Sequence, residues 1–397
     1  MKTTEFIFLL LGCCLFTGAC NGQDTQPAQQ AASARIGGGC EDCDVMYIGM
    51  PEIPSWTDTS SGWQEPGQKL LLTGTIFEPD GKTPASGIIL YYWQTDVNGY
   101  YSPKPGMDAR TGRHGHIRGW VKTGADGRYA IYTIRPAPYP NDVSPAHIHL
   151  LIKEPALEHE YYTDDVVFDD DKLLIPYLKK YPANNRGGSG IVRVLLRDSV
   201  QVAEHSIVLG LNIPGHPGMK AGAETGLSIG EDQPSFIPYH AYGPDKGSRA
   251  CPVCKYGRFH GILYFAGNGS DAGEISRWMR FLEKESETRQ QFLKTYLVYG
   301  KATERSAQTA DGFLRSLGEQ LNIRYSALTW VPSFSDRETE AYLNRIDQSV
   351  KNVFIIYKHR RIVDKFINMD PTPENFHLIA NTLEQTKGEF FDLKAMH

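Results

Sequence analysis

The sequence lacks any sustained run of lysine or arginine, and its formal net charge is -5. Nucleic-acid binding depends on basic side chains, so this composition gives no electrostatic reason to expect such a partner, and that class of function is set aside. Hydrophobic residues make up 41% and charged residues 22% of the 397 positions, which is ordinary globular composition. A chain of this length can form two hydrophobic cores, so we expect two domains.

An apolar run long enough to span a membrane is also lacking at the N-terminus. The segment Phe6–Phe16 is too short for a comfortable span but suits the hydrophobic region of a secretory signal. The next residues, 17–20, read TGAC and resemble the lipobox of bacterial lipoproteins, in which the cysteine is acylated after cleavage. We therefore expect residues 1–19 to be a lipoprotein signal peptide. The lipid on Cys20 would anchor the chain in a bacterial cell envelope, in the periplasm or at the outer membrane.

Two alternatives exist for this segment. Cleavage before Cys13 would leave a very short apolar stretch, and ordinary signal cleavage would give a soluble exported protein. Residues 20–39 are polar, rich in Ala, Gln and Gly, and without periodicity, so they predict a flexible tether.

Cysteine is scarce after the signal segment. Three of the seven cysteines lie in that segment, and the other four form two C-x-x-C pairs, Cys40 with Cys43 and Cys251 with Cys254. In an exported chain, disulfides within or between the pairs are the expected state. A four-cysteine zinc site is the alternative, because two such pairs have the spacing of zinc ligands.

Short strand-like segments separated by turns run from about Lys69 to Leu209. They cover residues 70–77, 87–94, 119–123, 128–134, 146–152 and 191–196. Asp126 and Gly127 stand between two of them and predict a hairpin, because glycine supplies the positive φ of a tight turn. Many short strands at this spacing predict an all-β sandwich, to which we assign residues 40–215.

The pattern changes after the Gly- and Pro-rich segment 216–255, which we expect to be a linker that carries the second cysteine pair. Residues 256–397 then predict strand, helix, strand, helix, strand, hairpin and helix. The last helix has Thr372 as its expected N-cap and Pro373 at its first position. This order of elements resembles the thioredoxin-like fold, so we predict an α/β domain of that kind.

The chemistry-bearing residues lie in the β-rich half. In His147-Ile148-His149 the strand period of two puts both imidazoles on one face, about 7 Å apart, where they can converge on one ion. Alone, the pair is weak evidence, because two histidines in a strand more often form a polar face than a metal site.

Two upstream segments sharpen the signal. One reads WQTDVNGYYSP from Trp93, the other reads TIRPAPYP up to Pro140, and the histidine pair stands in SPAHIH. Together these segments resemble the intradiol dioxygenase family, whose members carry a tyrosine segment after a tryptophan, then T-I-x-P-x-x-Y-P, then P-A-H-I-H. The resemblance covers roughly residues 69–209, and the order of three separate motifs makes it specific.

The resemblance implies a non-haem ferric iron, Fe(3+), held by Tyr101, Tyr139, His147 and His149. Two phenolates with two imidazoles independently favour a trivalent, oxygen-loving iron over zinc or copper. The resemblance also implies that a catechol-type diol chelates this metal, that Tyr139 is displaced and takes up a substrate proton, and that the ring is cleaved with O2. Tyr100 is the neighbour most easily confused with Tyr101, and strand alternation would send the two to opposite faces.

One departure from the family pattern concerns the residue before P-A-H-I-H, which is an arginine in many members and helps to stabilise charge on the activated substrate. Here the residue is Ser144. Replacement cations or donors could be Arg113, Arg118, Arg135, His114 or His116, although each is more simply a solvated or sheet-facing residue. The acidic run of Asp164, Asp165 and residues 169–171 lacks the ligand spacing of a calcium loop and predicts a solvated turn.

We therefore predict an envelope-anchored ferric intradiol ring-cleavage dioxygenase that acts on an aromatic diol and O2. Two alternatives stay open: a β-sandwich binding module without chemistry, and a thiol-disulfide protein that acts through its C-terminal domain. The second is disfavoured, because residues 268–272, where redox members of that fold place their cysteines, contain none.

Overall fold

The computed structural model describes residues 35–218, 225–257, 259–300, 307–388, 391 and 394–395. The predicted signal peptide and the tether up to residue 34 lie outside the described residues. Within them, no helix is both long and apolar enough to cross a membrane.

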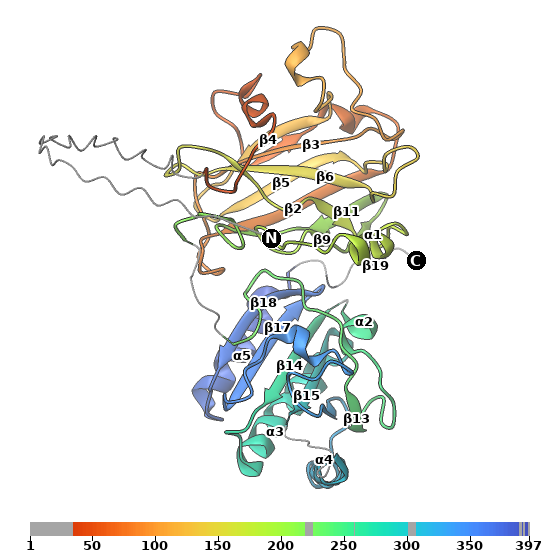
Figure 1. Ribbon diagram of the computed structural model, residues 1–397, viewed down its shortest axis with the longest axis vertical. Helices are drawn as coiled ribbons and strands as arrows, with labels where there is room; N and C mark the ends of the chain where they lie inside the picture. Colours follow the sequence, from red (N-terminus) through yellow and green to blue (C-terminus); the bar gives the residue numbers. More distant parts are fainter. Residues whose placement is uncertain are drawn as a thin grey trace, which may run out of the picture. The chain divides into compact units, whose positions relative to one another are not determined.

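The strands of the first half of the described chain form two β-sheets, one of which also takes up the C-terminal strand β19 (Lys394–Ala395) (Figure 1). The first contains, in spatial order, β1 (Thr57–Thr59), β5 (Arg128–Ile134), β2 (Lys69–Phe77), β11 (Val200–Glu204), β10 (Val194–Arg197) and β19 (Lys394–Ala395), with β12 (Ile207–Val208) paired to β2. The second contains β4 (Arg118–Lys122), β3 (Ile89–Gln94), β6 (His147–Lys153), β8 (Val166–Phe168) and β9 (Ile191–Val192), with β7 (Tyr161–Tyr162) paired to β6. A β-rich, sandwich-like arrangement is therefore present, with mixed parallel and antiparallel pairing.

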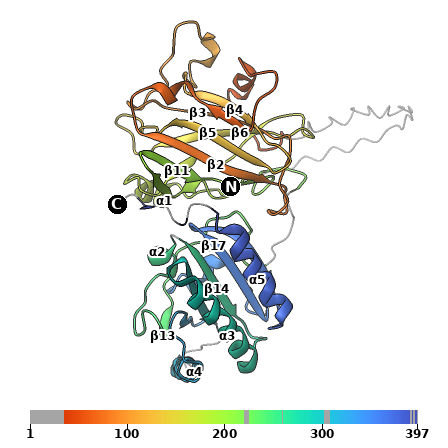
Figure 2. The same ribbon diagram turned by 180° about the vertical axis from the view of Figure 1, so that it is seen from behind.

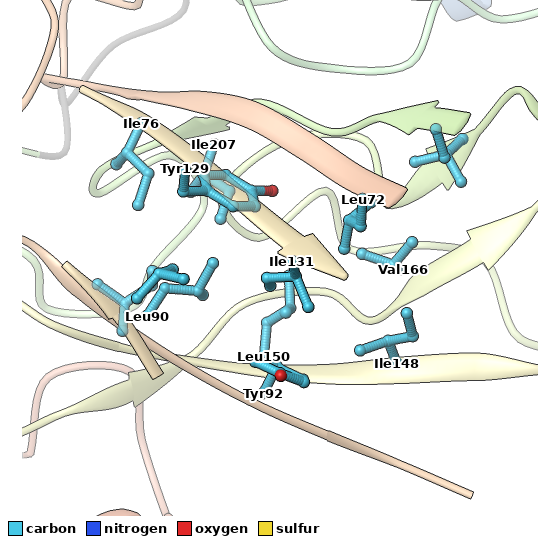
Figure 3. Close-up of a cluster of buried hydrophobic side chains, with 14 of the residues drawn as sticks. Leu72, Ile76, Leu90, Tyr92, Tyr129, Ile131, Ile148, Leu150, Val166 and Ile207 are labelled. Carbon is cyan, nitrogen blue, oxygen red and sulfur yellow. The ribbon is translucent and has the colours of Figure 1, made fainter. Parts of the chain in front are cut away.

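The core between the two sheets follows from strand alternation. Along β2, buried residues alternate with partly exposed ones over all nine positions, as expected for a strand with one face on the core. Figure 3 shows the resulting cluster, in which Leu72 and Ile131 of the first sheet pack toward Leu90 and Leu150 of the second. Each of these four side chains is fully buried.

The outer face of the second sheet is where the predicted metal ligands lie. In β6, Ile148, Leu150 and Ile152 belong to the main core, so His147 and His149 point to the opposite face. Trp93 of β3 lies directly opposite His149 in the antiparallel register. The prediction that both histidines share one face is confirmed.

The predicted hairpin at Asp126 and Gly127 is wrong in its pairing. Gly127 does have a positive φ of 67° and donates to Gly124 O in a tight turn. However, β4 pairs with β3 in the second sheet, whereas β5 pairs with β2 in the first. The turn therefore connects the two sheets, and Val121 of β4 and Ile131 of β5 enter the same core from opposite sheets.

The second half of the described chain contains a six-stranded sheet with the order β13, β16, β15, β14, β17, β18. The strands are β13 (Tyr239–Tyr242), β14 (His260–Ala266), β15 (Leu293–Tyr299), β16 (Ala327–Trp330), β17 (Asn352–Lys358) and β18 (Arg361–Ile367). The helices are α2 (Pro252–Tyr256), α3 (Ala272–Arg289), α4 (Ala307–Leu321) and α5 (Pro373–Thr386). Figure 2 shows α3 and α5 on the same side of this sheet, where Trp278 and Phe376 make an edge-to-face contact at 5.0 Å.

The predicted order of strands and helices after residue 256 is confirmed, including the hairpin of β17 and β18 and the Thr372 cap of α5. The predicted linker 216–255 needs correction, because β13 within it pairs with β16 of the sheet. Its four residues are too few to show periodicity among so many glycines and prolines. The predicted tether also ends too far along the chain at residue 39. Residues 35 and 37 already contact the folded part, since Arg35 pairs with Glu160 and the Gly37 amide donates to Pro214 O.

The cysteines form disulfides within each pair, Cys40 with Cys43 and Cys251 with Cys254. Among the described residues, the groups of potential metal ligands include Cys40 and Cys43 but neither Cys251 nor Cys254. The four-cysteine zinc alternative is therefore not formed. The remaining short helices are η1 (Cys43–Tyr47), η2 (Ser61–Gln64), η3 (Ala109–Thr111), α1 (Leu174–Lys180), η4 (Gln290–Phe292) and η5 (Ala341–Asn344).

Candidate metal and substrate site

Four side chains from three segments meet on the outer face of the second sheet. The Tyr101 Oη atom lies 2.8 Å from His149 Nε2 and 2.5 Å from Tyr139 Oη, and Tyr139 Oη lies 3.0 Å from His147 Nε2. These are the four residues that the sequence motifs single out. Their contacts form a continuous arc of two phenol oxygens and two imidazole nitrogens.

Local backbone structure explains how the tyrosines reach the histidines. Tyr101 follows the end of β3 in an irregular segment, where Gly99 has a φ of 82° that turns the chain. Tyr100 is 57% exposed and points away, whereas Tyr101 packs beside Trp93 and Met46. This placement agrees with the choice of Tyr101 over Tyr100 as the candidate ligand. The two side chains diverge in an irregular segment and not, as expected, through strand alternation.

The outer partners of the two imidazoles fix which nitrogen carries the proton. His147 Nδ1 lies 2.7 Å from Pro145 O, and His149 Nδ1 lies 2.9 Å from Asp165 Oδ1. A carbonyl and a carboxylate can only accept, so each Nδ1 must donate. Each Nε2 then presents a lone pair toward a tyrosine oxygen, as a metal ligand must.

Counting protons in the arc tests whether a cation fits this group. Three short contacts join the two phenol oxygens and the two Nε2 atoms. Two hydroxyl protons can satisfy only two of these contacts, because both Nε2 atoms are acceptors. A cation inside the arc would satisfy all four lone pairs at once, and the two-phenol, two-imidazole set suits ferric iron.

Burial shifts the pKa values of three of the four candidate ligands. Burial raises the pKa of the Tyr101 and Tyr139 phenols and lowers the pKa of His147. The site therefore favours neutral phenols and a neutral His147 imidazole, so phenolate ligands depend on the positive charge of the bound metal.

Asp165 is the functional residue that the sequence reasoning missed. Its place in the acidic run predicts a solvated turn, yet its carboxylate accepts a hydrogen bond from His149 Nδ1. Asp165, His147 and His149 also lie close enough together to resemble a two-histidine, one-carboxylate metal group. Because Asp165 approaches Nδ1 while both tyrosines approach Nε2, the carboxylate lies on the far edge of the ring and orients the ligand. Sequence spacing carries no signal for this contact.

The rest of the acidic run also has defined partners. Asp164 accepts the Asn185 amide, Asp169 accepts the Val194 amide, and Asp171 accepts the Ala146 amide just before the histidine pair. Asp170 forms an ion pair with Arg135. The prediction of a solvated turn holds only for residues 169–170, where the chain turns and Asp170 is exposed. For the other carboxylates of the run it is wrong, because they accept hydrogen bonds from donors that no local pattern reveals.

The Trp93 ring packs between two histidine rings, one of which is the candidate ligand His149. It stacks on His149 at 4.7 Å and on His114 at 4.2 Å, between centroids. His114 Nδ1 lies 2.8 Å from Tyr91 Oη, and burial lowers the pKa of His114 to about 4. A neutral His114 thus packs behind Trp93 as part of the wall.

A cavity of about 640 Å³ opens beside the arc. Trp93, Tyr139, His147 and His149 line one part of it, and α1 contributes Tyr177 and Leu178. The further lining residues are Ser144, Pro145, Tyr162, Thr163, Asp164, Asp165, Val167, Tyr181, Pro182, Ala183, Asn184, Arg186, Gly190 and Ile191. Five of the lining residues are tryptophan or tyrosine, and these rings next to the candidate metal ligands suit a planar aromatic ligand.

The five candidate replacements for the missing arginine are all engaged elsewhere. Arg113 pairs with Glu41, Arg118 donates to Ile48 O, Arg135 pairs with Asp170, His116 contacts Glu65, and His114 bonds to Tyr91. None of the five belongs to the cavity lining. The cation of the lining is Arg186, which the sequence reasoning did not consider.

Comparisons with known proteins agree with the motifs. Residues 54–185 match the family model Dioxygenase_C, described as Dioxygenase. The chain is 27% identical over 199 residues to the 6-chlorohydroxyquinol 1,2-dioxygenase of Cupriavidus pinatubonensis, covering 43% of this chain and 65% of that protein. It is also 27% identical over 174 residues to catechol 1,2-dioxygenase 1 of Acinetobacter lwoffii, covering 37% and 51%.

Among solved structures, the hydroxyquinol 1,2-dioxygenase of Pseudomonas putida DLL-E4 matches with 24% identity and a TM-score of 0.30, covering 40% of this chain and 61% of that one. The chain thus spans between about half and two thirds of the curated relatives it matches. The similarity is confined to the β-rich segment, and the cofactor that it indicates is ferric iron, which intradiol dioxygenases use. The relatives are enzymes of the dioxygenase class.

Proposed function

We propose that this protein is a ferric intradiol dioxygenase that cleaves a catechol-type aromatic diol with O2. The observation that carries the proposal is the arc of Tyr101, Tyr139, His147 and His149, in which two Nε2 lone pairs and two phenol oxygens face one another. The dioxygenase family match and the aromatic cavity beside the arc support it.

In this proposal the four side chains hold the ferric iron, which as a Lewis acid would draw electron density from a bound diol and so make it reactive toward O2. Asp165 and Pro145 O hold the two imidazoles in the tautomer that binds metal. Tyr139 is the catalytic proton acceptor, because its Oη faces both the arc and the cavity. Trp93 and Tyr162 line the wall against which the diol ring would pack.

The proposal extends to the parts of the chain around this site. Residues 1–19 act as a lipoprotein signal, and lipid on Cys20 holds the protein in the envelope. The C-terminal domain has a thioredoxin-like fold and serves docking or structure. Its helix α3 begins after Asp271, which caps the Glu274 amide in the place where a redox member of that fold would carry cysteine.

The test uses the purified mature protein after reconstitution with iron. We expect a visible absorption band from phenolate-to-ferric charge transfer, stoichiometric iron, and O2 uptake with a catechol-type diol. A colourless, iron-free protein would contradict the metal site. A band that shifts with diols but without O2 consumption across a broad panel would favour the binding-module alternative.

A further inference from the structure

Residues 35–48 form a strap that lies against the outer face of the second sheet, on the side that carries the candidate metal site. The helix η1 within the strap places Cys43 and Met46 in a buried position. These two side chains form one cluster with Tyr91 and Trp93 of β3. The strap therefore covers a face of the sheet that would otherwise meet solvent, and it does so next to the arc of candidate ligands.

The cluster that the strap completes also contacts two of the candidate ligands. Tyr101 packs against this cluster as a partly buried side chain, and so does Cys40 of the strap. Trp93 belongs to the cluster, and its ring stacks on His149 at 4.7 Å between centroids. The positions of Tyr101 and His149 therefore depend on packing to which the strap contributes.

Backbone carbonyls of the strap hold two residues of the cavity lining. The Tyr162 hydroxyl donates to Glu41 O at 2.7 Å, and Arg186 Nη2 donates to Gly37 O at 2.8 Å. Both side chains line the cavity beside the arc. Since such a hydrogen bond restricts the rotamers of a long side chain, the position of the strap sets where these two groups face the cavity.

The strap is attached to the sheet on both sides of its disulfide. Before the disulfide, Arg35 forms an ion pair with Glu160, whose carboxylate is nearly buried. After it, the Tyr47 hydroxyl donates to the same carboxylate at 2.6 Å, and Trp120 Nε1 donates to Met46 O at 2.6 Å. The disulfide closes the turn between these two attachments.

The disulfide between Cys40 and Cys43 restrains the part of the strap that faces the site. Its loop encloses Glu41, whose carbonyl accepts the Tyr162 hydroxyl. It also encloses Asp42, which has a φ of 58°, a left-handed conformation that costs free energy in a residue other than glycine. A cross-link offsets this cost by restricting the open chain. Without it, the loop would leave this conformation, and its contacts with the cluster would change.

Resting on the proposed function, we propose that the strap is a positioning element of the metal site, and that its disulfide must be closed for Tyr101 to hold iron tightly. No residue of the strap lines the cavity, so its residues act through others and are positioning residues. They act through Tyr101 and Trp93 by packing and through Tyr162 by a hydrogen bond. Groups that hold a metal ligand in place commonly change metal affinity by roughly 10- to 100-fold.

The test compares two double variants of the full chain. Cys40→Ser/Cys43→Ser opens the strap, and Cys251→Ser/Cys254→Ser removes the other disulfide as a matched control. In the first variant, transfer of iron to a chelator should be about tenfold or more faster than in wild type, and the visible band should shift with the Tyr101 phenolate. The control should match wild type in both properties. Equal transfer rates in the two variants would overturn the inference, as would a lower melting temperature without these two changes.

A second measurement uses the metal-free chain in the control background, so it requires neither bound iron nor folding of the first variant. Dithiothreitol gives two electrons and two protons to the strap disulfide, which opens to two thiols, and itself becomes a cyclic disulfide. Iodoacetamide then caps the thiols. Acetylation by N-acetylimidazole, located by peptide mass, should rise at Tyr101 and Tyr162 and stay constant at Tyr100, which is already 57% exposed.

Unchanged acetylation of Tyr101 would overturn the inference. A rise at the core residue Tyr129 as well would also overturn it, because the disulfide would then hold the whole fold and not the site. If wild type binds no iron, the proposed function fails, and the acetylation pattern still decides whether the strap positions Tyr101.

Discussion

His149 donates its Nδ1 proton to Asp165 across 2.9 Å, while its Nε2 atom faces the Tyr101 hydroxyl at 2.8 Å. One imidazole thus connects a carboxylate behind it to the candidate metal position in front of it. The carboxylate fixes both the tautomer and the orientation of the ring, and it increases the basicity of the ligand nitrogen.

Asp165→Asn should therefore weaken iron binding by roughly 10- to 100-fold, because an amide is a poorer acceptor and no longer fixes the tautomer. Competition with a chelator, followed by the visible band, measures this loss. Asp164→Asn is the matched control, since Asp164 lines the same cavity but accepts the backbone amide of Asn185. Equal iron affinity in both variants would exclude the role assigned to Asp165.

Tyr101→Phe should remove the larger part of the phenolate-to-iron band and most of the bound iron, because it deletes one anionic donor of the arc. The neighbouring Tyr100→Phe should change neither property, since Tyr100 is 57% exposed. Absorption spectra and metal analysis of the two variants give the comparison. Loss of the band in Tyr100→Phe alone would show that the wrong tyrosine was assigned.

Tyr139→Phe should keep part of the colour through Tyr101 but slow ring cleavage by roughly 10²- to 10⁴-fold, the usual range for a lost proton acceptor. Single-turnover O2 uptake with a saturating diol separates this effect from diol binding. A variant that binds the diol and cleaves it at the normal rate would show that another group takes up the proton.

The stability of the C-terminal domain should depend on pH through His260. Its Nε2 contacts Thr386 Oγ1 at 2.9 Å, and burial lowers its pKa from 6.5 to about 3. The unfolded chain therefore binds a proton that the folded chain does not between these two pH values. Stability is fully present above pH 6.5 and falls as the pH is lowered toward 3, by up to about 1.4 kcal/mol per pH unit.

Urea unfolding of wild type and His260→Gln between pH 7 and pH 4, roughly the window set by this shift, checks that prediction. The variant should show a shallower pH dependence, whatever its stability at neutral pH. Parallel curves for the two proteins would mean that other groups cause the acid sensitivity.

The C-terminal domain should not reduce insulin disulfides. Cys251 and Cys254 form a disulfide in the first turn of the five-residue helix α2, ahead of β14, and α3 begins at an aspartate cap. A turbidity assay on the full chain, with Cys251→Ser as its control, measures this activity. Reduction of insulin by wild type that disappears in the variant would restore the thiol-disulfide alternative.

The longer strands of the first half and the order of elements in the second half could be predicted, because they depend on local pattern. The strands β1, β7, β8, β11 and β12 were not predicted. Alternation in β2, the two-residue spacing of His147 and His149, and the Thr372 cap of α5 are all properties of neighbouring residues. The pairing of β4 with β3 could not be predicted from local sequence pattern. The turn at Gly127 fits a hairpin and a connection between sheets equally well, and only the burial of each strand's face decides between them.

The candidate site also has features that the sequence shows and features that depend on tertiary contacts. The sequence by itself determined the four ligand candidates, because their motifs are short and ordered, and it determined that Ser144 stands where a family arginine is common. Only the tertiary structure decided that Asp165 orients His149, that Arg186 lines the cavity, and that five other cations and histidines do not. Contacts across 16 residues or more depend on how the sheets and loops pack, and hydrogen-bond partners at that distance leave no periodic trace in the sequence.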